Sequence, residues 1–442
     1  MIKETVRLYR DYTKLLIGVV WTHWPQINSA ESPCNAIEKL IHTTTQNPAP
    51  RYTLFDRRFP KFPSYLRRVA IEAAIGQVSS FNTRYDQWQT FQRKRPDALP
   101  PQRTNINALN PALYRGQCIK FDDALSVAEI KVWSGTDWVW TAVPITGKRL
   151  RHAVPTNKTL SPSLLTDGKS IRLSVPFESK VTLPSPKSVR RVCGVDLGIN
   201  TTATCSIITQ DGTVISRQFL HRGMDIDRRD KGLATVRSKA HLTMGTTGSK
   251  LGRGFCRSIY RKAKNRNKEM TNQLSGQIVA FAAAHEAEVI VFEHLKQFRP
   301  KAGRKGSTLR QRFHGWLHRL LADKTVERAQ EACIRTAFVN PHGTSKFAYD
   351  GSGEVKRDTN NRALATFSNG KRYNADLNAS YNIAARWFAR VLGLSGRKAK
   401  ADATGKSSGA SSRMPTTLST LWLYAQSGRV AKLEAATTPC NG

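Results

Sequence analysis

Hydrophobic residues recur at helical spacing over much of the first 92 residues. The clearest helix begins at Ser64, a residue type that commonly caps helices. Its apolar face consists of Leu66, Ala70, Ala73, Phe81, Tyr85 and Trp88. The first residues differ, because apolar and polar side chains alternate at 2–10 as they do in a strand. We therefore predict a strand at 1–10 and a helical domain at 11–99.

Between 114 and 184 the apolar period changes to two. Short alternating runs at 118–121, 128–133, 138–143 and 171–176 are separated by Gly, Asp and Asn turns. This pattern predicts a small antiparallel β-barrel at 100–188, completed by the strand at 1–10. Trp133, Trp138 and Trp140 are expected in its core rather than on its surface as base-stacking platforms.

From residue 190 onward, strand and helix patterns alternate, which predicts an α/β layer. An apolar strand at 192–196 leads through a Gly-containing turn to a second strand at 202–208. Residues 394–415 are rich in Gly, Ser, Ala and Lys and are typical of a flexible linker. A short helix is expected at 418–435. The chain as a whole is therefore expected to be multidomain α+β.

Three acidic residues stand at the ends of these elements. Asp196 ends one apolar strand, Glu293 ends another at 289–293, and Asp376 lies in the first turn of a helix. Each has an ordinary alternative role: a turn cap, a solvated strand end or a helix N-cap. Together they can converge at one edge of a mixed sheet. Carboxylates suit Mg²⁺, and two ions about 3.5–4 Å apart can promote phosphodiester hydrolysis.

The charge of the chain indicates a polyanionic partner. Lys and Arg number 70 against 32 Asp and Glu, giving a formal charge of +38. A nucleic acid fits this charge; a packing protein of ribosomal or chromatin type fits poorly with 39% hydrophobic residues and 9 Trp. The apolar run at 15–21 is too short to cross a bilayer, and 1–14 lacks a secretory signal. We expect a cytoplasmic prokaryotic protein with no membrane partner, nucleoid-associated when bound to DNA.

The cysteines argue against a thiolate metal site. Seven are scattered along the chain without a CxxC pair. This usage is typical of reduced thiols in a cytosolic protein.

The three acidic segments resemble the split RuvC nuclease of TnpB proteins and of the miniature type V CRISPR effectors. The matching segments are Gly-Val-Asp196-Leu-Gly, Val-Ile-Val-Phe-Glu293-His-Leu and Asn-Ala-Asp376-Leu-Asn-Ala-Ser-Tyr-Asn-Ile-Ala. The resemblance implies an RNase H-like fold in which Asp196, Glu293 and Asp376 are catalytic and hold two Mg²⁺ ions. It also implies a guide RNA and a target DNA as partners, and it leaves open whether the protein is a monomer or a homodimer.

The resemblance extends the domain assignment along the whole chain. It implies a wedge β-barrel from 1–10 and 100–188, and a recognition domain at 11–99. The nuclease would occupy 189–343 and 372–393, interrupted by an insert at 344–371, with a linker and tail at 394–442.

The insert departs from the family pattern, in which a zinc ribbon carries two Cys pairs. Here Phe347 and Asp350 replace the first pair, and Thr366 and Asn369 the second. A tetrahedral thiolate site cannot form from these residues, so we predict no zinc. We expect a hairpin held by packing around Phe347, Tyr349 and Phe367.

Basic residues outline two candidate nucleic-acid contacts and one further basic segment. A cationic ridge at helical spacing consists of Arg257, Arg261, Lys264 and Lys268. Arg57, Arg58 and Lys61 are interleaved with aromatics at 51–66, a pattern that fits base stacking and an ordinary core beside a solvated basic face equally well. The basic segment at 299–307 fits an active-site lid or a disordered loop.

The sequence thus predicts an RNA-guided DNA endonuclease, a hydrolase acting on phosphodiester bonds. Two alternatives remain: an RNA-guided DNA-binding repressor with weakened or no cleavage, and an unguided structure-selective RuvC-like nuclease. The setting is either antiviral CRISPR defence or transposition, and the loss of the ribbon cysteines favours the former.

Overall fold

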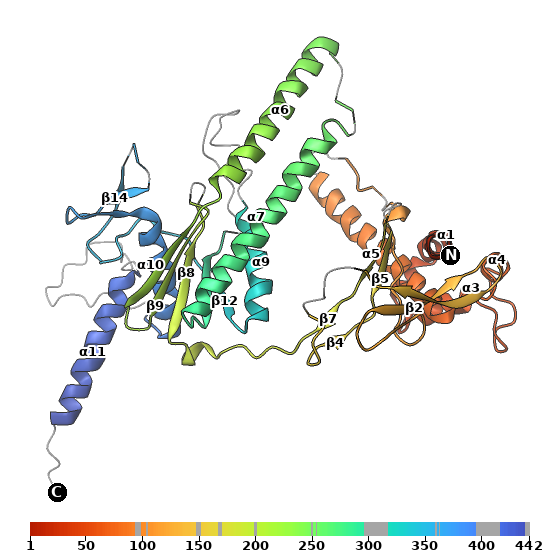
Figure 1. Ribbon diagram of the computed structural model, residues 1–442, viewed down its shortest axis with the longest axis horizontal. Helices are drawn as coiled ribbons and strands as arrows, with labels where there is room; N and C mark the ends of the chain where they lie inside the picture. Colours follow the sequence, from red (N-terminus) through yellow and green to blue (C-terminus); the bar gives the residue numbers. More distant parts are fainter. Residues whose placement is uncertain are drawn as a thin grey trace, which may run out of the picture. The chain divides into compact units, whose positions relative to one another are not determined.

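The chain folds as a multidomain α+β protein made of two compact units. The computed structural model describes residues 1–92, 99–102, 105–146, 152–166, 170–198, 201–248, 251–252, 254–295, 317–358, 360–361, 363–394 and 416–437. The first unit is Met1–Lys180 and the second is Val181–Gly442. Each unit has its own elements, which are labelled in Figure 1. The basic segment predicted at 299–307 and nearly all of the predicted linker at 394–415 lie outside the described residues.

The first unit begins with a long helix, so the prediction of a strand at 1–10 is wrong. Helix α1 (Ile2–Thr22) buries Val6, Tyr9, Thr13 and Leu16 on one face. These positions follow the helical period over about three turns, whereas the alternation that suggested a strand is confined to the first few residues. A helix of this length buries a continuous apolar stripe, and this outweighs the short local alternation.

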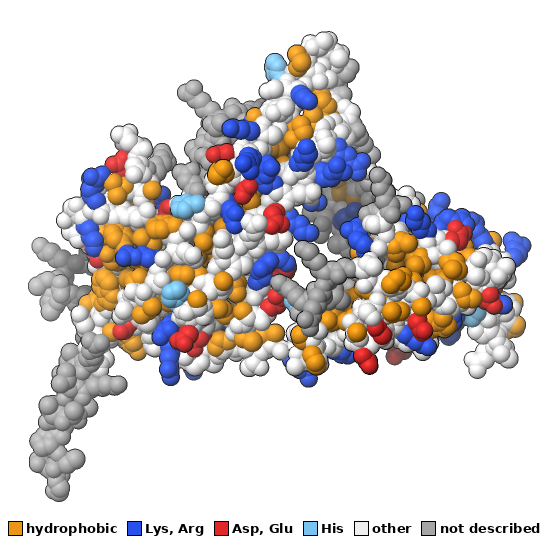
Figure 2. Space-filling model, in the orientation of Figure 1, with side chains coloured by type: hydrophobic (Ala, Val, Ile, Leu, Met, Phe, Trp, Pro, Cys, Tyr) orange, Lys and Arg blue, Asp and Glu red, His pale blue; other side chains and the backbone are white. Residues whose placement is uncertain are grey.

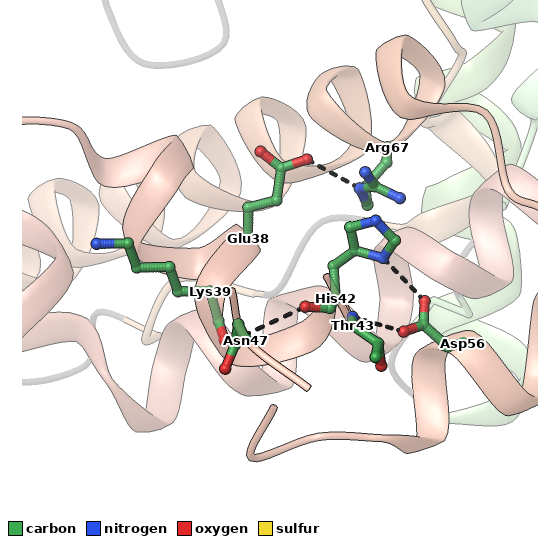
Figure 3. A network of polar contacts seen from close by, with 7 residues as sticks. All are labelled: Glu38, Lys39, His42, Thr43, Asn47, Asp56 and Arg67. Atoms are coloured by element: carbon green, nitrogen blue, oxygen red, sulfur yellow. Dashed lines mark hydrogen bonds and ion pairs between the residues drawn. The ribbon is translucent and has the colours of Figure 1, made fainter. Parts of the chain in front are cut away.

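Helix α1 packs against α5 (Ser64–Gln92), the helix that the sequence predicts at Ser64. Short helices α2 (Trp24–Asn28), α3 (Pro33–Ile41) and α4 (Leu54–Arg58) complete the helical part, followed by a 3₁₀ turn, η1 (Ile106–Ala108). Polar contacts hold these pieces together, as Figure 3 shows. Arg67 on α5 donates to Glu38 on α3 at 3.0 Å, and Asp56 on α4 accepts from the Thr43 amide at 2.7 Å.

The predicted strands of the first unit form, but the described ones do not close into a barrel. Strands β1 (Ile119–Phe121), β2 (Val127–Trp133) and β3 (Trp138–Pro144) make an antiparallel sheet. Two separate pairs are β4 (Lys158–Thr159) with β7 (Phe177–Glu178), and β5 (Ser163–Thr166) with β6 (Ile171–Ser174). Helix α1 packs beside β2, where the Trp133 amide donates to the Thr5 hydroxyl at 2.8 Å. The chain start therefore covers this sheet and does not extend it.

The tryptophans of this sheet only partly follow the prediction of a core. Trp133 and Trp138 are half-buried, and their rings lie 5.5 Å apart. Trp140 is 39% exposed, and the ammonium groups of Lys120 and Lys131 lie over its ring at 4.7 and 5.9 Å. Its side chain is therefore outside the core.

The second unit is built on one mixed five-stranded sheet with the order β10-β9-β8-β11-β12. Strands β8 (Arg191–Asp196), β9 (Ala203–Thr209) and β10 (Val214–Leu220) are antiparallel. Strands β11 (Val289–Glu293) and β12 (Arg335–Val339) run parallel to β8. The alternation and apolar runs in the sequence predict β8, β9 and β11 to within about a residue or two of these bounds.

Helices cover both faces of this sheet (Figure 1). Cys193, Val195 and Phe292 share a core with α7 (Arg257–Ala284) and α9 (His318–Glu331). The opposite faces of the same strands pack against α10 (Ala375–Val391) and α11 (Leu418–Thr437). Strands β8 and β11 carry apolar side chains on both faces of the sheet, so they are central to the unit.

The remaining elements extend from this layer. Helix α6 (Gly223–Thr247) packs along α7 to form a long hairpin. Strands β13 (Lys356–Arg357), β14 (Leu364–Thr366) and β15 (Arg372–Asn374) form a small sheet, and η2 (Pro186–Ser188) is a 3₁₀ turn before β8. Of the helices in the described ranges, none is long and apolar enough to cross a membrane.

Candidate active site

Two of the three predicted acids end neighbouring parallel strands. In the β8–β11 ladder Val195 pairs with Phe292, so Asp196 and Glu293 come next on both strands. Neighbouring strands lie about 4.8 Å apart, and side chains two residues apart point to the same face. Asp196 follows the alternation of Val192 and Gly194, whose face packs on α10. Both carboxyls therefore project from the same edge on the α10 side of the sheet.

The third acid comes from α10, and it is not the helix cap. Asn374 caps this helix, since its side chain accepts from the amides of Asp376 and Leu377 at 3.0 and 2.9 Å. The ordinary role proposed for Asp376 is therefore filled by another residue. The helix also lies close to β8 at Gly194, where an added β-carbon would overlap the carbonyl oxygen of Ser380.

The three carboxyls are near enough to affect one another. Burial raises the pKa of Asp196 well above its usual range, and the negative charges of Glu293 and Asp376 raise it further. Burial also raises the pKa of Glu293 and of Asp376. Three half-buried acids at one edge disfavour the charged state unless cations compensate them.

The structure adds three neighbours that sequence reasoning missed. The Thr344 hydroxyl donates to Glu293, and this hydrogen bond partly offsets the rise in its pKa. Arg357 on β13 lowers the pKa of both Asp196 and Asp376 through its charge. Arg386 on α10 lowers that of Glu293 in the same way. Thr344 opens the degenerate ribbon motif and was a detectable signal, whereas nothing in the sequence distinguishes the two arginines from the many others.

The donor chemistry of this edge fits Mg²⁺, although the side chains do not form a ready-made cage. Over the residues that the structure describes, no group of three or more His, Cys, Asp or Glu lies close enough to hold a metal ion. Mg²⁺ is usually bound by one or two carboxylates together with waters and substrate phosphates, so a closed protein cage is not required. Asp196, Glu293 and Asp376 are the residues that would hold it.

The degenerate ribbon is a folded hairpin region, as predicted. Phe367 is buried with Ala348 and Ala365, and its ring lies 5.6 Å from that of Tyr349. Phe347 is half-buried beside this cluster. Two of the four positions that carry cysteines in the family pattern are joined here by a hydrogen bond, from the Asn369 amide nitrogen to the Asp350 carboxylate at 3.3 Å.

The predicted basic ridge lies on the exposed face of α7. Arg257, Arg261, Lys264 and Lys268 are exposed, while Met270 and Leu274 of the same helix are buried. On the face shown in Figure 2, Lys and Arg side chains gather along the α6–α7 hairpin. The ridge is therefore accessible to a ligand.

The basic residues at 51–66 are exposed like those of the ridge on α7, but they lie next to buried aromatic rings. Arg57, Arg58 and Lys61 are exposed, and Lys61 pairs with Asp137 at 3.1 Å. Their aromatic neighbours Phe55, Phe59 and Phe62 are buried. Of the two interpretations left open by the sequence, these three rings support an ordinary core beside a basic face.

Comparisons with known proteins find one matching family and one TnpB-like relative. Residues 1–134 match the Aq_aa04 family. A TnpB-like protein of Aquifex aeolicus is 25% identical over 251 residues, which cover 54% of this chain and 80% of that protein. This relative confirms the resemblance that the acidic motifs indicate.

Two solved structures match parts of this chain at TM-scores below 0.5. A complex of Cas12f1 with single-guide RNA and target DNA has a TM-score of 0.49 and 13% identity, covering 86% of this chain and 80% of that one. The mini-RNA-guided endonuclease CRISPR-Cas_phi3 has a TM-score of 0.35 and 13% identity, covering 60% of this chain and 57% of that one.

Proposed function

On the premise that this chain is a relative of TnpB proteins, we propose that it is an RNA-guided DNA endonuclease with a RuvC-type, RNase H-like active site. The proposed catalytic residues are Asp196, Glu293 and Asp376. The observation that carries the proposal is the β8–β11 register, which sets Asp196 and Glu293 side by side at one edge of the sheet. The pKa of Asp196 is raised chiefly by burial and further by Glu293 and Asp376. Like charges gathered in a buried site destabilise a fold, and such sites are typical of function.

The proposed reaction is the hydrolysis of DNA phosphodiester bonds. Bound Mg²⁺ would supply activation of the attacking water and stabilisation of the leaving oxygen. The chain itself would orient the ligands: Thr344 holds the Glu293 carboxylate, and Asn374 fixes the first turn of α10 beside Asp376. The positive charge of Arg357 would reduce the repulsion between the acids and an incoming phosphate.

The guide RNA is inferred from the TnpB resemblance alone, because the net charge of +38 indicates a nucleic acid without distinguishing RNA from DNA. Sequence choice would come from base pairing between guide and target, while the protein contacts backbone and shape. The exposed ridge on α7 is the proposed surface for a nucleic-acid backbone.

A cleavage assay tests the proposal. Wild-type protein with its copurifying RNA and Mg²⁺ should cut DNA matched to that RNA. Asp196→Asn should abolish cutting and retain binding of RNA and target. Asp323→Asn removes the same charge from an exposed position of α9 and should cut like wild type. Equal cutting by Asp196→Asn would remove this acid from the mechanism.

A DNA-binding repressor is the second candidate, because the acids do not form a three-ligand group in the described structure. Tight guided binding without cutting in Mg²⁺ by the wild type would establish it. Cutting without any RNA would instead support an unguided structure-selective nuclease. Sequencing the copurifying RNA would distinguish repeat-spacer transcripts from transposon-end transcripts.

A further inference from the structure

A cavity of 340 Å³ lies beside the proposed active site. It is lined by Val339, Asn340, His342, Arg386, Arg390 and Thr416. Val339 ends β12 and pairs with Glu293 in the β11–β12 ladder. The cavity therefore lies one strand further along the sheet than the edge that carries the acids.

The polar groups of this cavity favour an anion. Arg386 and Arg390 stand one turn apart on α10, so both guanidinium groups project from the same face. Each guanidinium donates a hydrogen bond to a backbone carbonyl: Arg386 Nη1 donates to the Asn340 carbonyl at 2.7 Å, and Arg390 Nη1 to the Phe338 carbonyl at 3.3 Å. A guanidinium carries five N–H donors, so most remain available to a ligand.

Arg386 has a more specific signature. Its Nε is buried and has no hydrogen-bond partner in the described structure. An unsatisfied buried donor on a cation is costly, and an anion beside the guanidinium would offset this cost through its charge rather than through a hydrogen bond to Nε. The alternative is that Arg386 serves only as the counter-charge of Glu293, whose pKa it lowers. That alternative does not account for Arg390, which is exposed and lines the same cavity.

We propose that this cavity binds a phosphate group of a nucleic-acid strand and so positions the strand beside the carboxylates. The proposal rests on the proposed function and names a substrate contact for that site. Phosphate suits two neighbouring guanidinium groups, because a guanidinium presents paired donors that match two phosphate oxygens. A strand held here by one phosphate would present a neighbouring phosphodiester to the acids at the end of β8 and β11.

The direct test is binding of thymidine 3′,5′-bisphosphate to the full chain in EDTA, measured by calorimetry. Wild type should bind this probe. Arg390→Gln and Arg386→Lys should each weaken binding by roughly tenfold, the scale expected for loss of a hydrogen bond to a charged group. Lys324→Gln removes the same charge from α9, away from the cavity, and should leave affinity unchanged. Absent binding by wild type, or equal affinity in all four proteins, would overturn the proposal.

A second readout separates this proposal from the proposed function. In cleavage assays Arg390→Gln should raise KM for target DNA and change kcat little, as expected for lost substrate binding. Cutting by wild type with no bisphosphate binding would overturn the cavity alone. Bisphosphate binding that depends on Arg390 without any cutting would overturn the nuclease and leave the cavity as an anion site.

Discussion

Gly194 on β8 lies against the backbone of Ser380 on α10. A β-carbon on Gly194 would overlap the Ser380 carbonyl oxygen and lie 3.0 Å from the Ala384 β-carbon. Only a residue without a side chain allows the helix to lie this close to the strand. Asp196 stands two residues after Gly194, and Asp376 one turn before Ser380. The close approach of these backbones therefore sets the separation of two of the three acids.

Gly194→Ala should accordingly displace α10 and disturb the site. We expect the free energy of unfolding to fall by about 1–3 kcal/mol, as for overpacking in a core, and cleavage to be strongly reduced. Urea denaturation and the cleavage assay measure the two effects. Gly245→Ala in α6 is the matched control, since an added β-carbon meets nothing there. Wild-type stability and cutting in Gly194→Ala would show that this contact does not position the acids.

The pKa shifts predict how pH affects stability when metal is chelated. Folding raises the pKa of Asp196, Glu293 and Asp376, so the folded state binds protons more tightly than the unfolded state at these groups. Their favourable contribution to the free energy of unfolding is therefore complete below about pH 4, and it is lost as the pH rises through the pKa values of the folded state. Asp196→Asn removes the carboxyl whose charged state is disfavoured chiefly by burial and further by Glu293 and Asp376. In EDTA, its stability relative to wild type should increase from pH 4 to pH 8, measured by urea denaturation. A difference independent of pH would contradict the proposed clustering.

Thr344 is predicted to position Glu293 through its hydroxyl. Thr344→Val keeps the shape of the side chain but removes the donor, and we expect cleavage to fall roughly 10- to 100-fold, as for other residues that orient a metal ligand. The pH profile of kcat should also shift, because this hydrogen bond lowers the pKa of Glu293. Thr344→Ser should restore both. Failure of Ser to rescue would indicate a packing role instead.

The degenerate ribbon is predicted to need no zinc. Elemental analysis of the purified protein should find no stoichiometric zinc, and a zinc chelator should leave its stability unchanged. Asp350→Ala should lower stability by about 1 kcal/mol, because it removes acceptors for the Ser352 amide and for Asn369. One tightly bound zinc per chain would show that residues outside the family pattern supply the ligands.

The sequence was informative where long apolar patterns carry an element. The strand ending at Glu293 and the helix beginning after Asn374 are both where the pattern predicts them. It was misleading at 2–10, where a brief alternation concealed the first turns of α1. It was also misleading at Trp140, because alternation alone does not show which face of a small sheet another element covers.

The site was predictable in part for a similar reason. Each acid lies at the end of a predictable element, so its position in the chain could be inferred from the pattern. The roles of Arg357 and Arg386 depend on tertiary contacts between segments far apart in sequence. No local pattern distinguishes these arginines from the other basic residues of a chain with 70 Lys and Arg.

The most direct test of the central claim is an experimental structure of the protein with Mn²⁺ in place of Mg²⁺, with the ions located by their anomalous scattering. We predict ions coordinated by oxygens of Asp196, Glu293 and Asp376 at the end of β8 and β11, and their loss in Asp196→Asn. Ions bound elsewhere, or an edge that stays metal-free at saturating Mn²⁺ while the protein cuts DNA, would contradict the account.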